Sequence, residues 1–161
     1  MEGEIPGERD GHSATIVGDH MFVFGGYEEN YERFGQDVYR LDLNTFTWKL
    51  MVREYNYNVS VNQLPYPQSS YGEVPVHRDF HTATSVGGMM VIYGGRSSHE
   101  AGQLHHLGTD YYSNKVAFYN TSTSTWLCPE IRNCPLPSGR RSHSALSLDN
   151  GNLLIFGGYN G

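Results

Sequence analysis

The sequence predicts an all-β protein built from a repeated four-stranded antiparallel unit. One segment is written three times: "RDGHSATIVGDHMFVFGGY" starts at residue 9, "RDFHTATSVGGMMVIYGGR" at residue 78 and "RRSHSALSLDNGNLLIFGGY" at residue 140. Short runs of β-branched and aromatic residues inside it alternate in part with polar residues, as half-buried strands do. No stretch shows the apolar period of a helix, so we expect minimal helix content.

The first two strands of each unit lie within the repeated segment. In the first copy, "HSATIVG" (12–18) and "HMFVFGG" (20–26) form two such runs that meet at Gly18 and Asp19. The third copy has one extra residue between its His and its Gly pair. That residue falls at "DNGN", where a hairpin turn can absorb it.

A pair of glycines ends the second strand in every copy. Such a pair suits a place where no Cβ is tolerated, because the backbone has positive φ or another segment approaches closely. The three pairs are Gly25 and Gly26, Gly94 and Gly95, and Gly157 and Gly158.

Two outer strands complete the unit. "VYRLDLNTFTW" (38–48) aligns with "VAFYNTSTSTW" (116–126), which places Trp48 and Trp126 at equivalent positions. No counterpart follows the third Gly pair, so the chain contains two and a half copies. The predicted boundaries are a first unit at 1–52, a long loop insert at 53–77, a second unit at 78–130 and the first half of a third unit at 131–161.

A unit of about 50 residues with four strands, a Gly pair and a late Trp resembles the kelch repeat. The resemblance covers nearly the whole chain except 53–77. It implies kelch β-propeller blades, which are four-stranded antiparallel sheets ranged around a central axis, with the Trp side chains packed between blades. Two and a half blades do not close a ring, so the expected architecture is an incomplete propeller.

The order of "RDGHSA", "RDFHTAT" with "GGR", and "GRRSHSA" with "IFGGYN" is similar to that in kelch receptors of cullin-RING ubiquitin ligases, which recognise protein C-termini. The resemblance implies a protein-interaction module that recognises substrates of such a ligase by their C-terminal peptide degrons. A cullin-RING adaptor would then dock on segments outside these blades. Two alternatives stay open: a kelch scaffold for cytoskeletal or chromatin partners, and, less favoured, a propeller enzyme.

The composition of the chain disfavours some classes of partner. The formal net charge is −6, whereas a nucleic-acid-binding surface usually carries a basic excess. No apolar run follows Met1, so we expect neither a signal peptide nor a membrane span. Cys128 and Cys134 fit no disulfide framework and are interpreted as free thiols. These features favour a cytoplasmic or nuclear protein that binds no nucleic acid directly and no membrane.

Connectivity brings polar residues to one edge. In an antiparallel pair, the residues that lead into the first strand and those that leave the second share an edge. Arg, Tyr and Ser collect there around the axis, and they suit a small anion such as a peptide's terminal carboxylate. The resemblance implies that Arg96, and Arg141 with its neighbour Ser142, clamp that carboxylate. The predicted rim of the peptide site comprises Tyr27, Arg140 and Tyr159.

Other polar residues have a structural interpretation. The arginines that recur in every copy (Arg9, Arg78 and Arg140) indicate a contact between blades. The repeated histidines (His12, His81 and His143) are expected to be buried hydrogen-bonding residues. Arg96 and Arg141, in contrast, break the repeat, because the other copies have Tyr or Asp there. The loop residues His99, His105 and His106 could be metal ligands with Asp110, but loop histidines are more often solvated, so we expect no metal and no cofactor.

Overall fold

The computed structural model describes residues 1–52, 72, 74–97, 99–100, 103–104, 110–129 and 135–161. Apart from one 3-10 turn, η1 (Glu29–Tyr31), the regular elements in these ranges are β-strands. The predicted all-β class is therefore confirmed. None of the described segments forms a helix long and apolar enough to cross a membrane.

The first blade is a five-stranded sheet with the order β1-β7-β6-β3-β2. Its strands are β1 (Glu2–Gly3), β2 (Ser13–Val17), β3 (His20–Phe24), β6 (Val38–Asp42) and β7 (Thr47–Val52). The last four form the predicted antiparallel unit. β1 adds a short parallel strand on the outer edge of β7, which the sequence pattern did not predict.

The second blade repeats this arrangement with the order β15-β14-β9-β8. Its strands are β8 (Thr82–Val86), β9 (Met89–Tyr93), β14 (Val116–Asn120) and β15 (Thr125–Leu127). Gly72 makes an isolated parallel bridge to Trp126 on the outer edge, the position that β1 has in the first blade. Most of the predicted insert at 53–77 lies outside the described residues.

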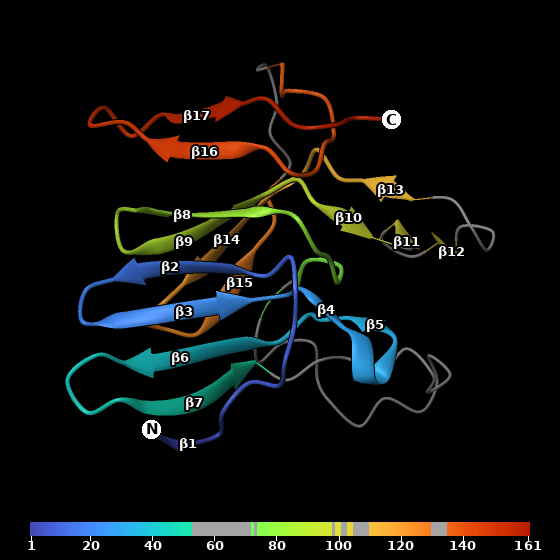
Figure 1. Ribbon diagram of the computed structural model, residues 1–161. Helices are drawn as coiled ribbons and strands as arrows, with labels where there is room; N and C mark the ends of the chain where they lie inside the picture. The colour runs from blue at the N-terminus through green and yellow to red at the C-terminus, as the bar shows by residue number, and fades with distance from the viewer. Residues whose placement is uncertain (53–71, 73, 98, 101–102, 105–109, 130–134) are drawn as a thin grey trace.

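The third sheet has two described strands, β16 (Ser144–Ser147) and β17 (Leu153–Phe156), which pair antiparallel. The innermost strands β2, β8 and β16 lie next to one another in this order (Figure 1). The described chain is thus two blades and half of a third, an incomplete ring as predicted.

Short hairpins extend the blades beyond β3 and β9. They are formed by β4 (Tyr27–Glu28) with β5 (Arg33–Phe34), β10 (Arg96–Ser97) with β13 (Tyr111–Tyr112), and β11 (His99–Glu100) with β12 (Gln103–Leu104). All of them project from the same end of the blades, the right-hand side of Figure 1. These hairpins occupy connections that are longer here than the repeat requires.

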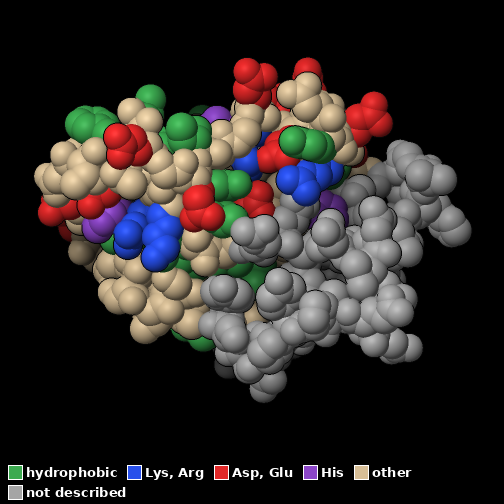
Figure 2. Space-filling model, turned by 90° about the horizontal axis from the view of Figure 1, so that it is seen from below, with side chains coloured by type: hydrophobic (Ala, Val, Ile, Leu, Met, Phe, Trp, Pro, Cys, Tyr) green, Lys and Arg blue, Asp and Glu red, His purple; other side chains and the backbone are tan. Residues whose placement is uncertain are grey.

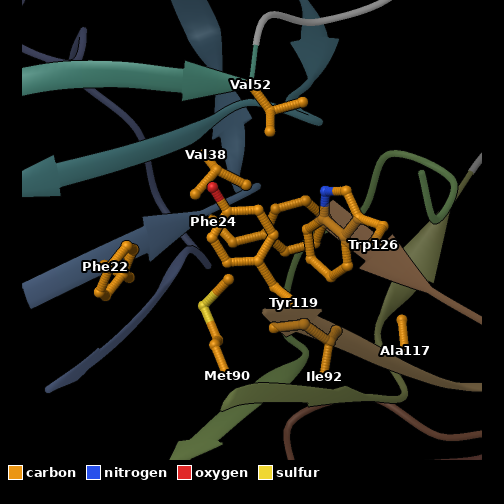
Figure 3. Packing of buried hydrophobic residues seen from close by; sticks show 9 residues of the cluster. All are labelled: Phe22, Phe24, Val38, Val52, Met90, Ile92, Ala117, Tyr119 and Trp126. Carbon is orange, nitrogen blue, oxygen red and sulfur yellow. The ribbon is translucent and has the colours of Figure 1, made fainter. Parts of the chain in front are cut away.

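The main hydrophobic core lies between the first and second blades (Figure 3). Phe24 is fully buried, and its ring centroid lies 5.1 Å from that of Trp126. Burying one such side chain contributes about 1.5–3 kcal/mol. The expectation that a Trp packs between blades is confirmed for Trp126. Trp48 instead packs inside the first blade, against Val23 and Leu41.

The six glycines of the pairs have positive φ, as one of the two predicted reasons requires. The second reason also holds for Gly25, where a Cβ would lie 2.6 Å from the carbonyl oxygen of Arg78 and 2.9 Å from Cε1 of His81. Both neighbours belong to the next blade. The Gly26 amide donates a hydrogen bond of 2.9 Å to the same Arg78 carbonyl. The pairs therefore let one blade's backbone touch the next blade.

Candidate functional site

The predicted shared edge is present in all three blades. At each blade, the residue that leads into the first strand forms an isolated antiparallel bridge with the residue that leaves the second. The bridged pairs are Asp10 with Tyr27, Asp79 with Arg96, and Arg141 with Tyr159. These pairs lie at the same end of the inner strands, so they form one shared edge of the three blades.

Backbone hydrogen bonds join the three blades at this edge. The Phe80 amide donates to the Gly11 carbonyl at 2.7 Å, and the Ser142 amide donates to the Phe80 carbonyl at 2.9 Å. All three residues have positive φ, and for Phe80 the value is 50°. A bulky residue rarely adopts this conformation, so surrounding contacts must hold it. The two backbone bonds tie Phe80 to both the first and the third blade.

Arg96 is paired with a buried carboxylate. Its Nε lies 3.1 Å from Asp79 Oδ1 and its Nη2 lies 2.5 Å from Asp79 Oδ2. The Asp79 side chain is fully buried, whereas the Arg96 side chain is 28% exposed. Burial raises the pKa of Asp79 despite the neighbouring guanidiniums. This ion pair was not predicted from the sequence, although Asp79 stands directly opposite Arg96 in the register.

Guanidiniums and aromatic rings alternate across the edge. The Arg96 guanidinium carbon lies 5.4 Å from the ring centroids of both Phe34 and Phe80. The Arg141 guanidinium carbon lies 5.8 Å from the Phe80 centroid and 5.3 Å from that of Tyr159. Such distances are within the range of cation–π attraction. The two predicted clamp arginines therefore both lie near the same ring, that of Phe80.

Arg141 differs from Arg96 in its polar contacts. Its Nε is buried and has no hydrogen-bond partner among the described residues. A buried donor without a partner costs about 1–3 kcal/mol, so a ligand that satisfies it gains that amount. Ser142, the third predicted clamp residue, is exposed beside it. Arg141 therefore differs from Arg96, whose Nε is bonded to an internal carboxylate.

Two of the three predicted rim residues lie next to this row of guanidiniums and aromatic rings. Tyr27 packs edge-on against Phe34, with ring centroids 5.2 Å apart, and Tyr159 is 53% exposed. The third, Arg140, is engaged in bonds to Ser138 and Gly157. Phe34 and Phe80 were not identified from the sequence. The available signal was that Phe80 stands where the other copies have Gly and Ser.

The repeated arginines are structural, but their side chains bond within a blade rather than between blades. In each copy Nε donates to the carbonyl two residues earlier and Nη1 to the carbonyl of the first paired glycine, at 2.8–3.1 Å. The predicted blade-to-blade contact is made by the backbone carbonyls of Arg78 and Arg140 and not by the side-chain bonds described above. Backbone bonds make that contact, such as the 2.8 Å bond from the Gly95 amide to the Arg140 carbonyl.

Two of the repeated histidines, His81 and His143, are buried and hydrogen-bonded as predicted, and their bonds join neighbouring blades. His81 Nε2 lies 2.6 Å from Ser13 Oγ, and His143 Nε2 lies 2.8 Å from Thr82 Oγ1. Burial, followed by the charge of Arg78, holds the pKa of His81 well below its ordinary value. His12 is exposed, contrary to expectation, because none of the described blades packs against its side of the first sheet.

Charges of opposite sign are interleaved on the surface. On the face seen in Figure 2, the basic side chains lie beside acidic ones. A hollow of about 220 Å³ near Tyr27 is lined by Glu8, Arg9, Asp10, Glu29 and Asn30. Among the described residues no group of three or more His, Cys, Asp or Glu side chains could hold a metal. His105 and His106 lie outside those residues.

Comparisons with known proteins agree with the repeat pattern. A sequence model of the KLHDC2/KLHL20/DRC7 Kelch-repeats domain matches residues 1–161. Kelch domain-containing protein 3 from Homo sapiens is 40% identical over 161 residues, which cover 99% of this chain and 36% of that protein. The chain thus spans about a third of the length of such relatives. The similarity to this protein, which the order of the blade motifs also indicates, is confirmed.

More distant relatives show the range of the fold. A Thlaspi arvense protein named N-(sulfonatooxy)prop-2-enimidothioate sulfolyase is 28% identical over 158 residues, covering 97% of this chain and 37% of its own length. The solved structure of YjhT matches with a TM-score of 0.65 at 20% identity, covering 98% of this chain and 36% of that structure. The structural match supports the blade architecture alone.

Proposed function

The chain belongs to the KLHDC2/KLHL20/DRC7 Kelch-repeats family, and we propose that it is the substrate-recognition part of a cullin-RING ubiquitin ligase that binds C-terminal peptides. The ligand's terminal carboxylate contacts Arg141 first, with Arg96 and Ser142 beside it. The adaptor of the ligase docks on segments outside these residues, and the protein acts in the cytoplasm or nucleus. The role is one of binding, without catalysis.

The observation that carries this proposal is the convergence of Arg96 and Arg141 on the ring of Phe80. Both arginines depart from the repeat, whereas the structural arginines obey it. A residue that departs from its own repeat has no repeated structural task, so a ligand is the more economical reason for its presence.

The stacking favours a planar carboxylate over other ligands. The guanidinium carbons of Arg96 and Arg141 each lie 5.3–5.8 Å from two aromatic ring centroids. Because Asp79 takes the Nε and Nη2 donors of Arg96, the N–H groups of Arg141 are the donors left for a ligand. A guanidinium edge can form two parallel hydrogen bonds to a carboxylate, and charge-assisted bonds are about twice as strong as neutral ones. The unpartnered Nε of Arg141 supplies one such donor.

The first test is a pull-down with a peptide library in two forms, one with free C-termini and one with C-terminal amides. We expect the full-length protein to capture peptides from the free form only. Equal capture of both forms would refute carboxylate recognition and favour the scaffold alternative. Capture of neither form would refute peptide binding.

A second test assigns the arginines. Arg141→Lys and Arg96→Lys keep the charge but lose the planar fork, so Lys should substitute poorly. Truncation of either to Ala should cost about 2–5 kcal/mol of binding free energy, because a buried partner charge loses its bonds. Arg9→Ala is the matched control, since it should lower the melting temperature and leave the peptide affinity of the folded fraction unchanged. Unchanged affinity in both Lys variants would rule out the clamp.

A further inference from the structure

A fully buried carboxylate already occupies one of the two arginines of the proposed site. Asp79 takes the Nε and Nη2 donors of Arg96, at 3.1 and 2.5 Å. These are the side-on donors that a planar carboxylate ligand would itself use. In the ligand-free protein, Arg96 is therefore bonded to an internal counterpart of the ligand.

The charges around Asp79 come close to balance. Arg96 on β10 bonds to it, and Arg141 in front of β16 adds a second positive charge. Asp10 in front of β2 adds a negative one. Two guanidiniums thus face the carboxylates of Asp79 and Asp10, and Asp110 adds a further negative charge near Arg96. An additional carboxylate must compete with Asp79 for Arg96.

Asp79 is not required to hold Arg96 in place. The rings of Phe34 and Phe80 also contact the guanidinium, each with its centroid 5.4 Å from the guanidinium carbon. Two backbone hydrogen bonds with Asp79, at 2.8 and 3.0 Å, fix the Arg96 main chain and do not depend on the carboxylate. What the Asp79 side chain adds is negative charge.

We propose that the Asp79 carboxylate is an internal competitor that keeps Arg96 closed to anions until Asp79 loses its charge. This inference rests on the proposed carboxylate site and adds the order in which its two arginines become available to an anion. Arg141 is open at all times, and Arg96 opens when Asp79 is neutral. Since burial raises the pKa of Asp79, neutralisation begins above the ordinary range of an aspartate.

The experiment measures binding of trifluoroacetate, a small carboxylate that stays ionised in mild acid, to the full-length protein. The NMR signals of the arginine Nε–H groups report which guanidinium responds. Asp79→Asn keeps the size of the side chain and an acceptor oxygen, and it should tighten binding about tenfold by removing one nearby negative charge. The signal of Arg96 should then respond along with that of Arg141.

Asp10→Asn is the matched control. It removes the same charge at the equivalent position of the preceding blade, where the side chain is exposed. Solvent screens exposed charges strongly, so binding should tighten by about twofold or less. Equal tightening by both variants would reduce the effect to net charge and overturn the proposal. Unchanged or weaker binding in Asp79→Asn would overturn it as well.

Trifluoroacetate binding measured as a function of pH is a second test, which remains possible if Asp79→Asn does not fold. Trifluoroacetate should bind the unmodified protein more tightly as the pH falls through the raised pKa of Asp79. Asp10→Asn should keep this dependence, and folded Asp79→Asn should lose it. Binding that does not change with pH, or is absent at every pH, would contradict the proposal.

The outcome is separable from that of the proposed function. If peptide capture fails but Asp79→Asn tightens trifluoroacetate binding, the anion site and its competitor stand and peptide recognition falls. If capture needs a free carboxylate but Asp79→Asn changes nothing, the competitor alone falls.

Discussion

Equivalent residues of the repeat lie at the junction between the first two blades and on the open face of the third sheet, but their surroundings differ. Phe24 and Phe156 each pair with a serine, Ser13 or Ser144, and each precedes a Gly pair. Phe24 is fully buried against the second blade, whereas Phe156 is 77% exposed. A Cβ on Gly25 would collide with the next blade, but on Gly157 it would meet nothing within 4 Å.

This difference teaches what the repeated motif is for. If these residues served only their own sheet, they would be equally buried in every copy. They are buried only where another blade follows, so the Phe, the serine hydroxyl and the first glycine form one half of a junction. The His and the Arg carbonyl of the next blade form the other half. The motif is a device for joining blades.

The largest expected difference is in the free energy of unfolding between variants of Phe24 and Phe156. Phe24→Ala should lower the free energy of unfolding by about 3–5 kcal/mol, because it leaves a cavity between blades. Phe156→Ala in the 161-residue chain should change it by about 0.5 kcal/mol or less, as exposed positions do. Urea denaturation measures both. A comparable loss for the two variants in the full-length protein, but not in this chain, would show that a further blade covers Phe156.

The next effect separates the first glycines of two pairs. A Cβ at Gly94 would lie 2.5 Å from Cε1 of His143 and 2.6 Å from the Arg140 carbonyl. Gly94→Ala should therefore cost about 2–4 kcal/mol, from positive φ and overpacking together. Gly157→Ala has only the φ penalty, about 1 kcal/mol. Equal melting temperatures for the two variants would contradict the close approach between blades.

Acid should weaken the junction between the first two blades, because His81 is buried there. Its pKa is lowered in the folded protein, so below about pH 6.5 the unfolded chain binds a proton that the folded chain excludes. The free energy of unfolding should then fall with pH by at most about 1.4 kcal/mol per pH unit for this group. His81→Gln should flatten the dependence measured by denaturation at several pH values. A dependence that survives His81→Gln but disappears in His12→Gln would disprove this assignment.

The smallest effect concerns the open face. Exposed apolar side chains on an unpaired sheet favour association, so the 161-residue chain should self-associate or melt with low cooperativity. Leu154 and Phe156 are 52% and 77% exposed on this face. Phe156→Asp should reduce association in sedimentation velocity, whereas a change at exposed Phe46, on the turn before β7, should not. A monomer with sharp two-state unfolding would count against the prediction.

Much of the fold could be predicted because its signals are local. Strand alternation and the turn at "DNGN" each depend on residues close together in the sequence. The parallel strand β1 could not be predicted in this way, since two residues are too few to show a pattern. The candidate site was predicted in part: connectivity placed Arg96 and Arg141 on the correct edge, but it gave no information on what each guanidinium contacts.

The sequence alone determined the copies, the strand order within a blade and the edge on which the departures from the repeat collect. Each follows from the alternation of side chains and from short connections, which act within one blade. Only the tertiary structure decided that Asp79 is bonded to Arg96, that the Phe80 ring lies near two guanidiniums and that His81 is buried while His12 is exposed. The Phe80 stack and the burial of His81 depend on how one blade packs against the next. The Asp79–Arg96 pair depends on the side-chain conformations of both residues, which direct Nε and Nη2 of Arg96 at the buried carboxylate.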